Sequence, residues 1–187
     1  EHTFLSSLAD RKNCMENIIA IILARGGSKG IPEKNIINFC DTSAIIKLYH
    51  HEVGSEWMEA IFNDANAIIV ISELTLVEFY SAVLKKVRTG EITNEASDEV
   101  IRNFEKDCHE KFILTFLDSR VIQKAKDFLS RYGRTDSLRT LDALQLAACL
   151  QKSPPEIRLI CADSHLLKIA ELEGINAVNP EKEEGSI

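Results

Sequence analysis

Short apolar runs alternate with amphipathic stretches along most of this chain. From Ile36 onward, runs with β character occupy residues 36–40, 67–71, 112–116, 157–161 and 175–178. The segments between them carry apolar residues near helical spacing, as at Trp57, Met58, Ile61 and Phe62. The run 67–71 contains no polar residue, which is typical of a strand buried on both faces of a sheet. This alternation predicts an α/β fold with a mostly parallel central sheet between helices.

Capping residues and glycines predict where the helices begin and end. Ser, Thr, Asp and Asn accept hydrogen bonds at helix N-termini, and glycine favours the turn that ends a helix. Helices are therefore expected around 43–49, from Gly54-Ser55, from Ser72 to Gly90, from Thr93-Asn94 to about 109, from Asp118-Ser119, from Thr135-Asp136-Ser137 to about 151, and over roughly 164–173 before Gly174. Pro154-Pro155 remove backbone donors and close the sixth of these units.

Composition places the chain among ordinary globular proteins. Of 187 residues, 45% are hydrophobic and 27% are charged, and the length suggests one domain with an appendage. No apolar run approaches the roughly 20 residues that span a bilayer, and no signal peptide is evident. Cysteines at 14, 40, 108, 149 and 161 show no CxxC spacing, which favours a reducing cytoplasm over a disulfide framework.

Residues 17–35 form a separate pattern, in which a β-branched run leads into a basic, glycine-rich loop. Such turns are typical of phosphate-binding sites. The stretch Ala-Arg-Gly-Gly-Ser-Lys-Gly resembles the opening loop of the acylneuraminate cytidylyltransferases, although Leu23 stands where that family usually has proline. The resemblance implies CTP contacts from Arg25 and Lys29. The alternative is an extra strand and loop left by a gene fusion.

The formal net charge of −7 argues against gripping nucleic acid through bulk electrostatic attraction. A bound cation inverts the local field at an acidic site, however, so phosphodiester chemistry stays open.

Two aspartates share one context. Asp41 and Asp163 each follow an apolar strand and precede a helix. Helix capping explains either residue alone, since an Asp N-cap stabilises a helix by about 1 kcal/mol. Parallel strands nevertheless gather their carboxyl ends at one edge of a sheet, where α/β proteins bind ligands. We therefore expect these two carboxylates to lie near each other.

Two helical acids complete the candidate set. Asp142 shares a stripe with Leu138, Gln145, Leu146 and Cys149, and a carboxylate among apolar residues needs a cation or a donor. Capping by Asp136 or Ser137 leaves Asp142 without a capping role.

Glu78 flanks the apolar stripe of its own helix, so a solvated flank is the alternative. Glu73, in a first helical turn, is a weaker candidate because the helix dipole favours an acid there anyway. Thr42 and Ser43 are candidates to orient the Asp41 carboxylate or a metal-bound water, and helix capping is their alternative.

Several ordered motifs resemble the PIN domain. They are Asp41-Thr42-Ser43-Ala44, Ser72-Glu73-Leu74-Thr75-Leu76-Val77-Glu78-Phe79, Leu138-Arg139-Thr140-Leu141-Asp142-Ala143-Leu144-Gln145-Leu146-Ala147, Ala162-Asp163 and Val178-Asn179-Pro180. More narrowly they resemble the VapC-type toxins of bacterial toxin–antitoxin pairs. The resemblance implies a three-layer α/β/α domain over residues 36–187, with residues 1–35 as an N-terminal extension.

The same resemblance implies an endoribonuclease that uses Mg²⁺ or Mn²⁺ to activate water. Its metal ligands and catalytic residues would be Asp41, Glu78, Asp142 and Asp163, and hard divalent cations do prefer carboxylate oxygen. One or two ions fit the pattern equally.

A homodimer and a cognate antitoxin are also implied by the resemblance. Candidate phosphate contacts are Lys47, Arg134 and Arg139. The alternatives are a catalytically silent module that binds an antitoxin or other partner, and a CTP-binding nucleotidyltransferase remnant.

Overall fold

A single parallel sheet organises the part of the chain that the structure describes, residues 36–151 and 157–183. This computed structural model has strands β1 (Ile36–Cys40), β2 (Ala67–Ser72), β3 (Ile113–Thr115), β4 (Arg158–Ile160) and β5 (Asn176–Val178). Their order is β3-β2-β1-β4-β5, and every pairing is parallel. The predicted strands are confirmed, although β3, β4 and β5 are shorter than their apolar runs.

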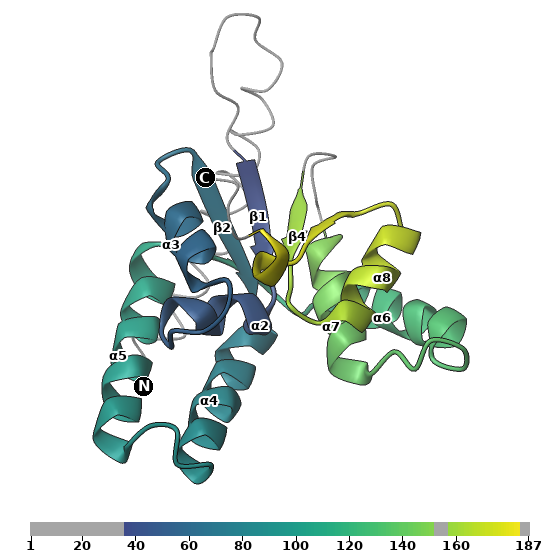
Figure 1. Cartoon of the computed structure of the whole chain (residues 1–187). Helices are drawn as coiled ribbons and strands as arrows, with labels where there is room; N and C mark the ends of the chain where they lie inside the picture. The colour runs from purple at the N-terminus through teal and green to yellow at the C-terminus, as the bar shows by residue number, and fades with distance from the viewer. Residues whose placement is uncertain (1–35, 152–156, 184–187) are drawn as a thin grey trace, which may run out of the picture. The chain divides into compact units, whose positions relative to one another are not determined.

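Helices cover both faces of the sheet, which confirms the three-layer α/β/α fold. The elements are α2 (Thr42–Ile45), η1 (Ile46–Leu48), α3 (Ser55–Asn63), α4 (Glu73–Arg88), α5 (Asn94–Glu110), α6 (Ser119–Tyr132), α7 (Thr140–Cys149), α8 (Ser164–Leu172) and η2 (Pro180–Lys182). Helices α3, α4 and α5 gather on one side, and α6, α7 and α8 on the other (Figure 1). Right-handed crossovers explain this division, because the chain moves outward from β1 to β3 and then returns past β1 to β4.

Aromatic residues form much of the core beside α4 and α5. Phe79 and Phe104 are buried and stacked, with ring centroids 3.8 Å apart. Tyr49 packs edge-on against Phe79 at 5.2 Å and hydrogen-bonds Asp107 from its hydroxyl group. Burying a phenylalanine side chain contributes roughly 1.5–3 kcal/mol, so this cluster holds α4 and α5 against each other and against the chain just after η1.

Most of the predicted helix caps are confirmed. Ser72 accepts a hydrogen bond from the Thr75 backbone, and Thr93 and Asp118 cap α5 and α6 in the same manner. The cap of α3 differs, because Gly54 occupies it in a left-handed conformation and the Ser55 hydroxyl donates instead to the Lys47 carbonyl.

The predicted start of α7 at Thr135-Asp136-Ser137 is wrong. Helix α7 begins at Thr140, with Arg139 as its N-cap. The reason lies in the preceding turn, where Ser137 has a φ of 53° and the Asp136 carboxylate binds Lys168 at 2.8 Å. This left-handed residue interrupts the helix, so the chain re-enters helical geometry only after Arg139.

Some predictions lie beyond these residues. The glycine-rich loop with Arg25 and Lys29, and Pro154-Pro155, fall outside the described ranges. The division into 1–35 and 36–187 stays a prediction. No helix in the described ranges is both long and apolar enough to cross a bilayer.

Candidate functional site: four carboxylates at the strand ends

The strand order reverses between β1 and β4, which makes their carboxyl ends a topological switch point. Ligand sites of open α/β sheets lie outside the sheet at such a point, where the two connections diverge. Asp41 directly follows β1, and its backbone N–H donates to the Ile160 carbonyl at the end of β4 at 2.9 Å. Asp163 lies three residues beyond Ile160. The fold therefore brings these two acids to one edge.

Asp41 is nearly buried and its carboxylate is held at one oxygen. Oδ2 accepts hydrogen bonds from the Ser43 backbone at 3.0 Å and from the Ser43 hydroxyl at 2.7 Å. The buried thiol of Cys161 approaches the same oxygen at 3.6 Å. The Ser43 hydroxyl in turn accepts from the Ala162 backbone at 2.9 Å. Asp41 is therefore the N-cap of α2, and the Ser43 hydroxyl ties its carboxylate to the chain that follows β4.

Glu78 is half-buried on α4 and is also held at one oxygen. Oε2 accepts hydrogen bonds from the Thr42 hydroxyl at 2.6 Å and from the Gln145 amide at 2.8 Å. Burial raises the pKa of Glu78, the two hydrogen bonds oppose this shift, and the charges of Asp41 and Asp142 add to it. A carboxylate kept in this setting is poised to bind a cation, which would offset both burial and repulsion.

Asp142 lies in the first turn of α7, where the helix dipole favours an acid. Burial raises the pKa of Asp142, and the charges of Asp163 and Asp41 raise it further, while the Arg139 backbone N–H and charge oppose the shift. The later start of α7 therefore gives Asp142 a partial capping role that the sequence-based argument excluded. Its acidic neighbours remain the feature that helix capping does not explain.

Asp163 is the N-cap of α8. Its Oδ1 accepts hydrogen bonds from the His165 and Leu166 backbones at 2.7 and 3.1 Å. The negative charge of Asp163 raises the pKa of Asp142, so the acid that follows β4 interacts electrostatically with the acid on α7.

The four carboxylates therefore share one electrostatic environment but are not drawn together as metal ligands. No group of three or more His, Cys, Asp or Glu side chains in residues 36–151 and 157–183 has the closeness needed to hold a metal ion. Hard oxygen donors predominate, and the hydrogen bonds of Asp41, Glu78 and Asp163 within the described ranges each involve one carboxylate oxygen. This donor set fits a divalent cation.

The predicted phosphate contacts have different outcomes. Lys47 is 2% exposed, and its ammonium pairs with Glu52 at 3.0 Å and Glu181 at 2.8 Å, so its assignment as a phosphate contact is wrong. The sequence did not reveal that two acids enclose it. Arg139 and Arg134 are exposed, and Arg139 lies beside Asp142.

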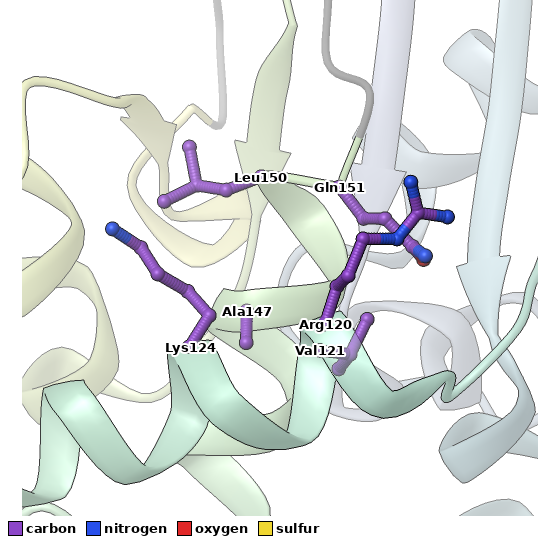
Figure 2. A pocket seen from close by; sticks show the side chains of 6 residues that line it. All are labelled: Arg120, Val121, Lys124, Ala147, Leu150 and Gln151. Atoms are coloured by element: carbon purple, nitrogen blue, oxygen red, sulfur yellow. The ribbon is translucent and has the colours of Figure 1, made fainter.

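A cavity of about 310 Å³ lies away from these acids, between α6 and α7. Arg120, Val121 and Lys124 line it from α6, and Ala147, Leu150 and Gln151 line it from the C-terminal end of α7 (Figure 2). The rise of a helix places Gln151 about 13 Å along the axis from Asp142. The cavity is therefore separate from the carboxylates.

Sequence reasoning missed the role of Gln145, which it treated only as part of an apolar stripe. An amide three residues from an acid, on the same buried face, was the available signal. It missed Cys161 as well, whose position next to Asp41 depends on the pairing of β1 with β4.

Comparison with known families identifies the class of protein. Residues 39–172 match the PIN domain family. The chain therefore belongs to the PIN domain family. No curated protein gave a match.

Solved structures with the same fold include toxin–antitoxin proteins. A chain of VapBC2 from Rickettsia felis, bound to a DNA fragment from its promoter, is 14% identical with a TM-score of 0.54, covering 76% of this chain and 98% of that one. A chain of FitAcB from Neisseria gonorrhoeae is 16% identical with a TM-score of 0.56, covering 78% and 99%. VapC20 from Mycobacterium tuberculosis, described as a sarcin-ricin loop cleaving toxin, is 14% identical with a TM-score of 0.55, covering 71% and 94%. At this identity the likeness establishes the fold.

Proposed function

We propose that this protein is a divalent-metal-dependent endoribonuclease and the toxin of a toxin–antitoxin pair. The observation that supports the proposal is that the negative charges of several carboxylates act on one another near the carboxyl ends of β1 and β4. Burial and neighbouring acids raise the pKa of both Glu78 and Asp142 there. Such clustering of perturbed carboxylates costs folding free energy, which a bound cation offsets.

Asp41, Glu78, Asp142 and Asp163 would hold Mg²⁺ or Mn²⁺ through their oxygens. When bound, the cation supplies Lewis acidity that generates a nucleophile from water and stabilises the leaving oxygen. The chain's own residues orient the ligands. Ser43 holds Asp41, and Thr42 holds Glu78.

The proposed substrate is RNA, and it would contact only the part of the surface around the acidic site. A protein of net charge −7 does not hold a polyanion over its whole surface. Arg139, exposed at the start of α7 beside Asp142, is the proposed phosphate contact, with Arg134 near it in sequence.

An antitoxin and a second copy of the chain are the proposed protein partners. Support comes from the motif resemblance to VapC-type toxins and from complexes among the structures of similar fold. Neither partner is required for the cleavage test below.

Cleavage of labelled RNA tests the proposal. Purified full-length protein should cut a mixed cellular RNA with Mn²⁺ or Mg²⁺ and stop cutting when EDTA is added. Asp41→Asn should reduce the rate at least about 100-fold, because it removes a ligand charge at the site. Asp98→Asn, at an exposed position on α5, should keep the wild-type rate. Metal-independent cutting, or equal rates for Asp41→Asn and wild type, would contradict the proposal. No cutting at all would favour the silent module.

A further inference from the structure

We propose that Gln145 is a positioning residue that sets the carboxylate of Glu78 for cation binding. This inference rests on the proposed function and adds a residue outside the predicted set. Gln145 is 1% exposed and lies on α7, three residues after Asp142. Helix α7 would then supply both one metal ligand and the support for a ligand on α4.

The amide of Gln145 is fully engaged across three elements. Its Oε1 accepts a hydrogen bond from the Ser72 hydroxyl at 2.7 Å, at the end of β2. Its Nε2 donates to Glu78 Oε2 at 2.8 Å and lies within 3.3 Å of the Thr75 and Thr42 hydroxyls. A buried amide in a low-dielectric setting makes stronger hydrogen bonds than in water, and it is costly to leave unpaired. The network therefore has one preferred arrangement.

The direction of this network matters for Glu78. An ionised carboxylate only accepts hydrogen bonds, so it requires the Nε2 side of the amide. The Ser72 hydroxyl donates a hydrogen bond to Oε1 of Gln145, and this contact fixes the amide in that orientation. Thr42 donates to the same Oε2, so two donors hold one oxygen of Glu78. The other oxygen of Glu78, Oε1, accepts no hydrogen bond from any residue that the structure describes, which leaves it for a cation.

The competing explanation is that Gln145 only stabilises the core. Asn38 provides the matched control, because it is also a fully buried amide. Its Oδ1 accepts from Arg158 Nε at 2.9 Å and Nη2 at 2.7 Å, and no carboxylate is involved. Asn38→Leu should therefore lower stability without changing the cation site.

The test compares Mn²⁺ affinity and turnover in wild type, Gln145→Met and Asn38→Leu. Calorimetric titration of Mn²⁺ should show about tenfold weaker binding in Gln145→Met, the usual size for losing a hydrogen-bond partner of a metal ligand. The kcat for RNA should fall with KM little changed, because the RNA contacts remain. Asn38→Leu should keep the affinity and kcat of the wild type.

A double-mutant cycle excludes indirect effects. In a Glu78→Gln background, Gln145→Met should cause no further loss of Mn²⁺ affinity, since the residue acts through Glu78. If Gln145→Met fails to fold, Gln145→Asn keeps a polar core and shortens the amide, so it should weaken Mn²⁺ binding in the same direction.

Two failures are distinguishable. Wild-type Mn²⁺ affinity and kcat in the Gln145 variant would overturn the positioning role and leave the nuclease intact. A wild-type protein that neither binds Mn²⁺ nor cuts RNA would overturn the proposed function, and the positioning role with it.

Discussion

At the scale of single residues, hydrogen-bond donors set the orientation of three carboxylates in this site. Ser43 holds Asp41, Thr42 and Gln145 hold Glu78, and the α8 backbone holds Asp163. These hydrogen bonds orient three of the carboxylates separately, and within the described residues they do not bring the acids together as a set of metal ligands.

The raised pKa values predict how metal-free stability depends on pH. For Asp142 the folded state binds protons more tightly than the unfolded chain, whose ordinary pKa is 3.8. Stability from this group is therefore full below pH 3.8 and is lost as pH rises through the folded pKa. Glu78 acts in the same direction from its ordinary value of 4.5.

Asp142→Asn should accordingly raise the melting temperature at pH 7 in EDTA by a few degrees, because the uncharged amide avoids both the cost of burying a charge and the repulsion from Asp163 and Asp41. The gain should disappear near pH 3, where the carboxyl is protonated in both states. Thermal unfolding followed by circular dichroism measures both. Asp98→Asn serves as the control, and a lower melting temperature for Asp142→Asn at pH 7 would refute the assigned repulsion.

The sequence was sufficient to single out the four acids but not their surroundings. Strand-end placement indicated Asp41 and Asp163, and an apolar context indicated Asp142. The donors to Glu78 come from α2 and α7, which are remote in the chain. No local pattern encodes such a contact, because it exists only after the helices pack.

At the scale of elements, short turns decide where the functional helices begin. Ser137, in a left-handed conformation, delays α7 to Thr140 and so places Asp142 in its first turn. Thr135, Asp136 and Ser137 all favour helix caps in isolation, so local propensity indicated an earlier start. The ion pair of Asp136 with Lys168 of α8 is a tertiary contact that overrides this preference.

The start of α3 offers a second test of turn geometry. Gly54 has a φ of +87°, and a Cβ there would lie 2.8 Å from the backbone carbonyl of Pro180. Gly90 has a φ of +77° with no atom within 4 Å of that position in the described ranges. Gly90→Ala should thus cost only the left-handed backbone, about 1 kcal/mol.

Gly54→Ala should cost roughly 1–3 kcal/mol more than Gly90→Ala, because η2 must move away from the added methyl group. Urea unfolding of both variants measures the difference directly. Equal losses would show that the close approach to Pro180 carries no energetic weight.

At the scale of the whole molecule, cation binding couples the site to global stability. A ligand that binds only the folded state stabilises it by about 2.7 kcal/mol at 100 times its dissociation constant. In a domain of this size, Mn²⁺ at that level should raise the melting temperature by about 5–10 °C. Differential scanning calorimetry with and without EDTA measures the shift. Asp41→Asn should abolish it, and an unchanged wild-type melting temperature would count against the site.

Element type followed from the sequence alone, since the period of the apolar residues reports which side chains of a helix or strand are buried. The alternation also implied parallel strands, because each crossover needs a helix. It did not reveal that β4 lies beside β1, which brings Asp163 and Cys161 to Asp41.

This chain's sequence by itself determined the element types, most helix caps and the acids worth testing, because periodicity and capping act over a few residues. Tertiary structure alone decided the strand order, the burial of Lys47 between two acids, and the amide bridge from Gln145 to Glu78. The physical reason is range. The pairing of β1 with β4, the contact of Lys47 with Glu181 and the bridge from Gln145 to Glu78 all join residues far apart in the chain, and only the packed sheet and its helices bring them within hydrogen-bonding distance.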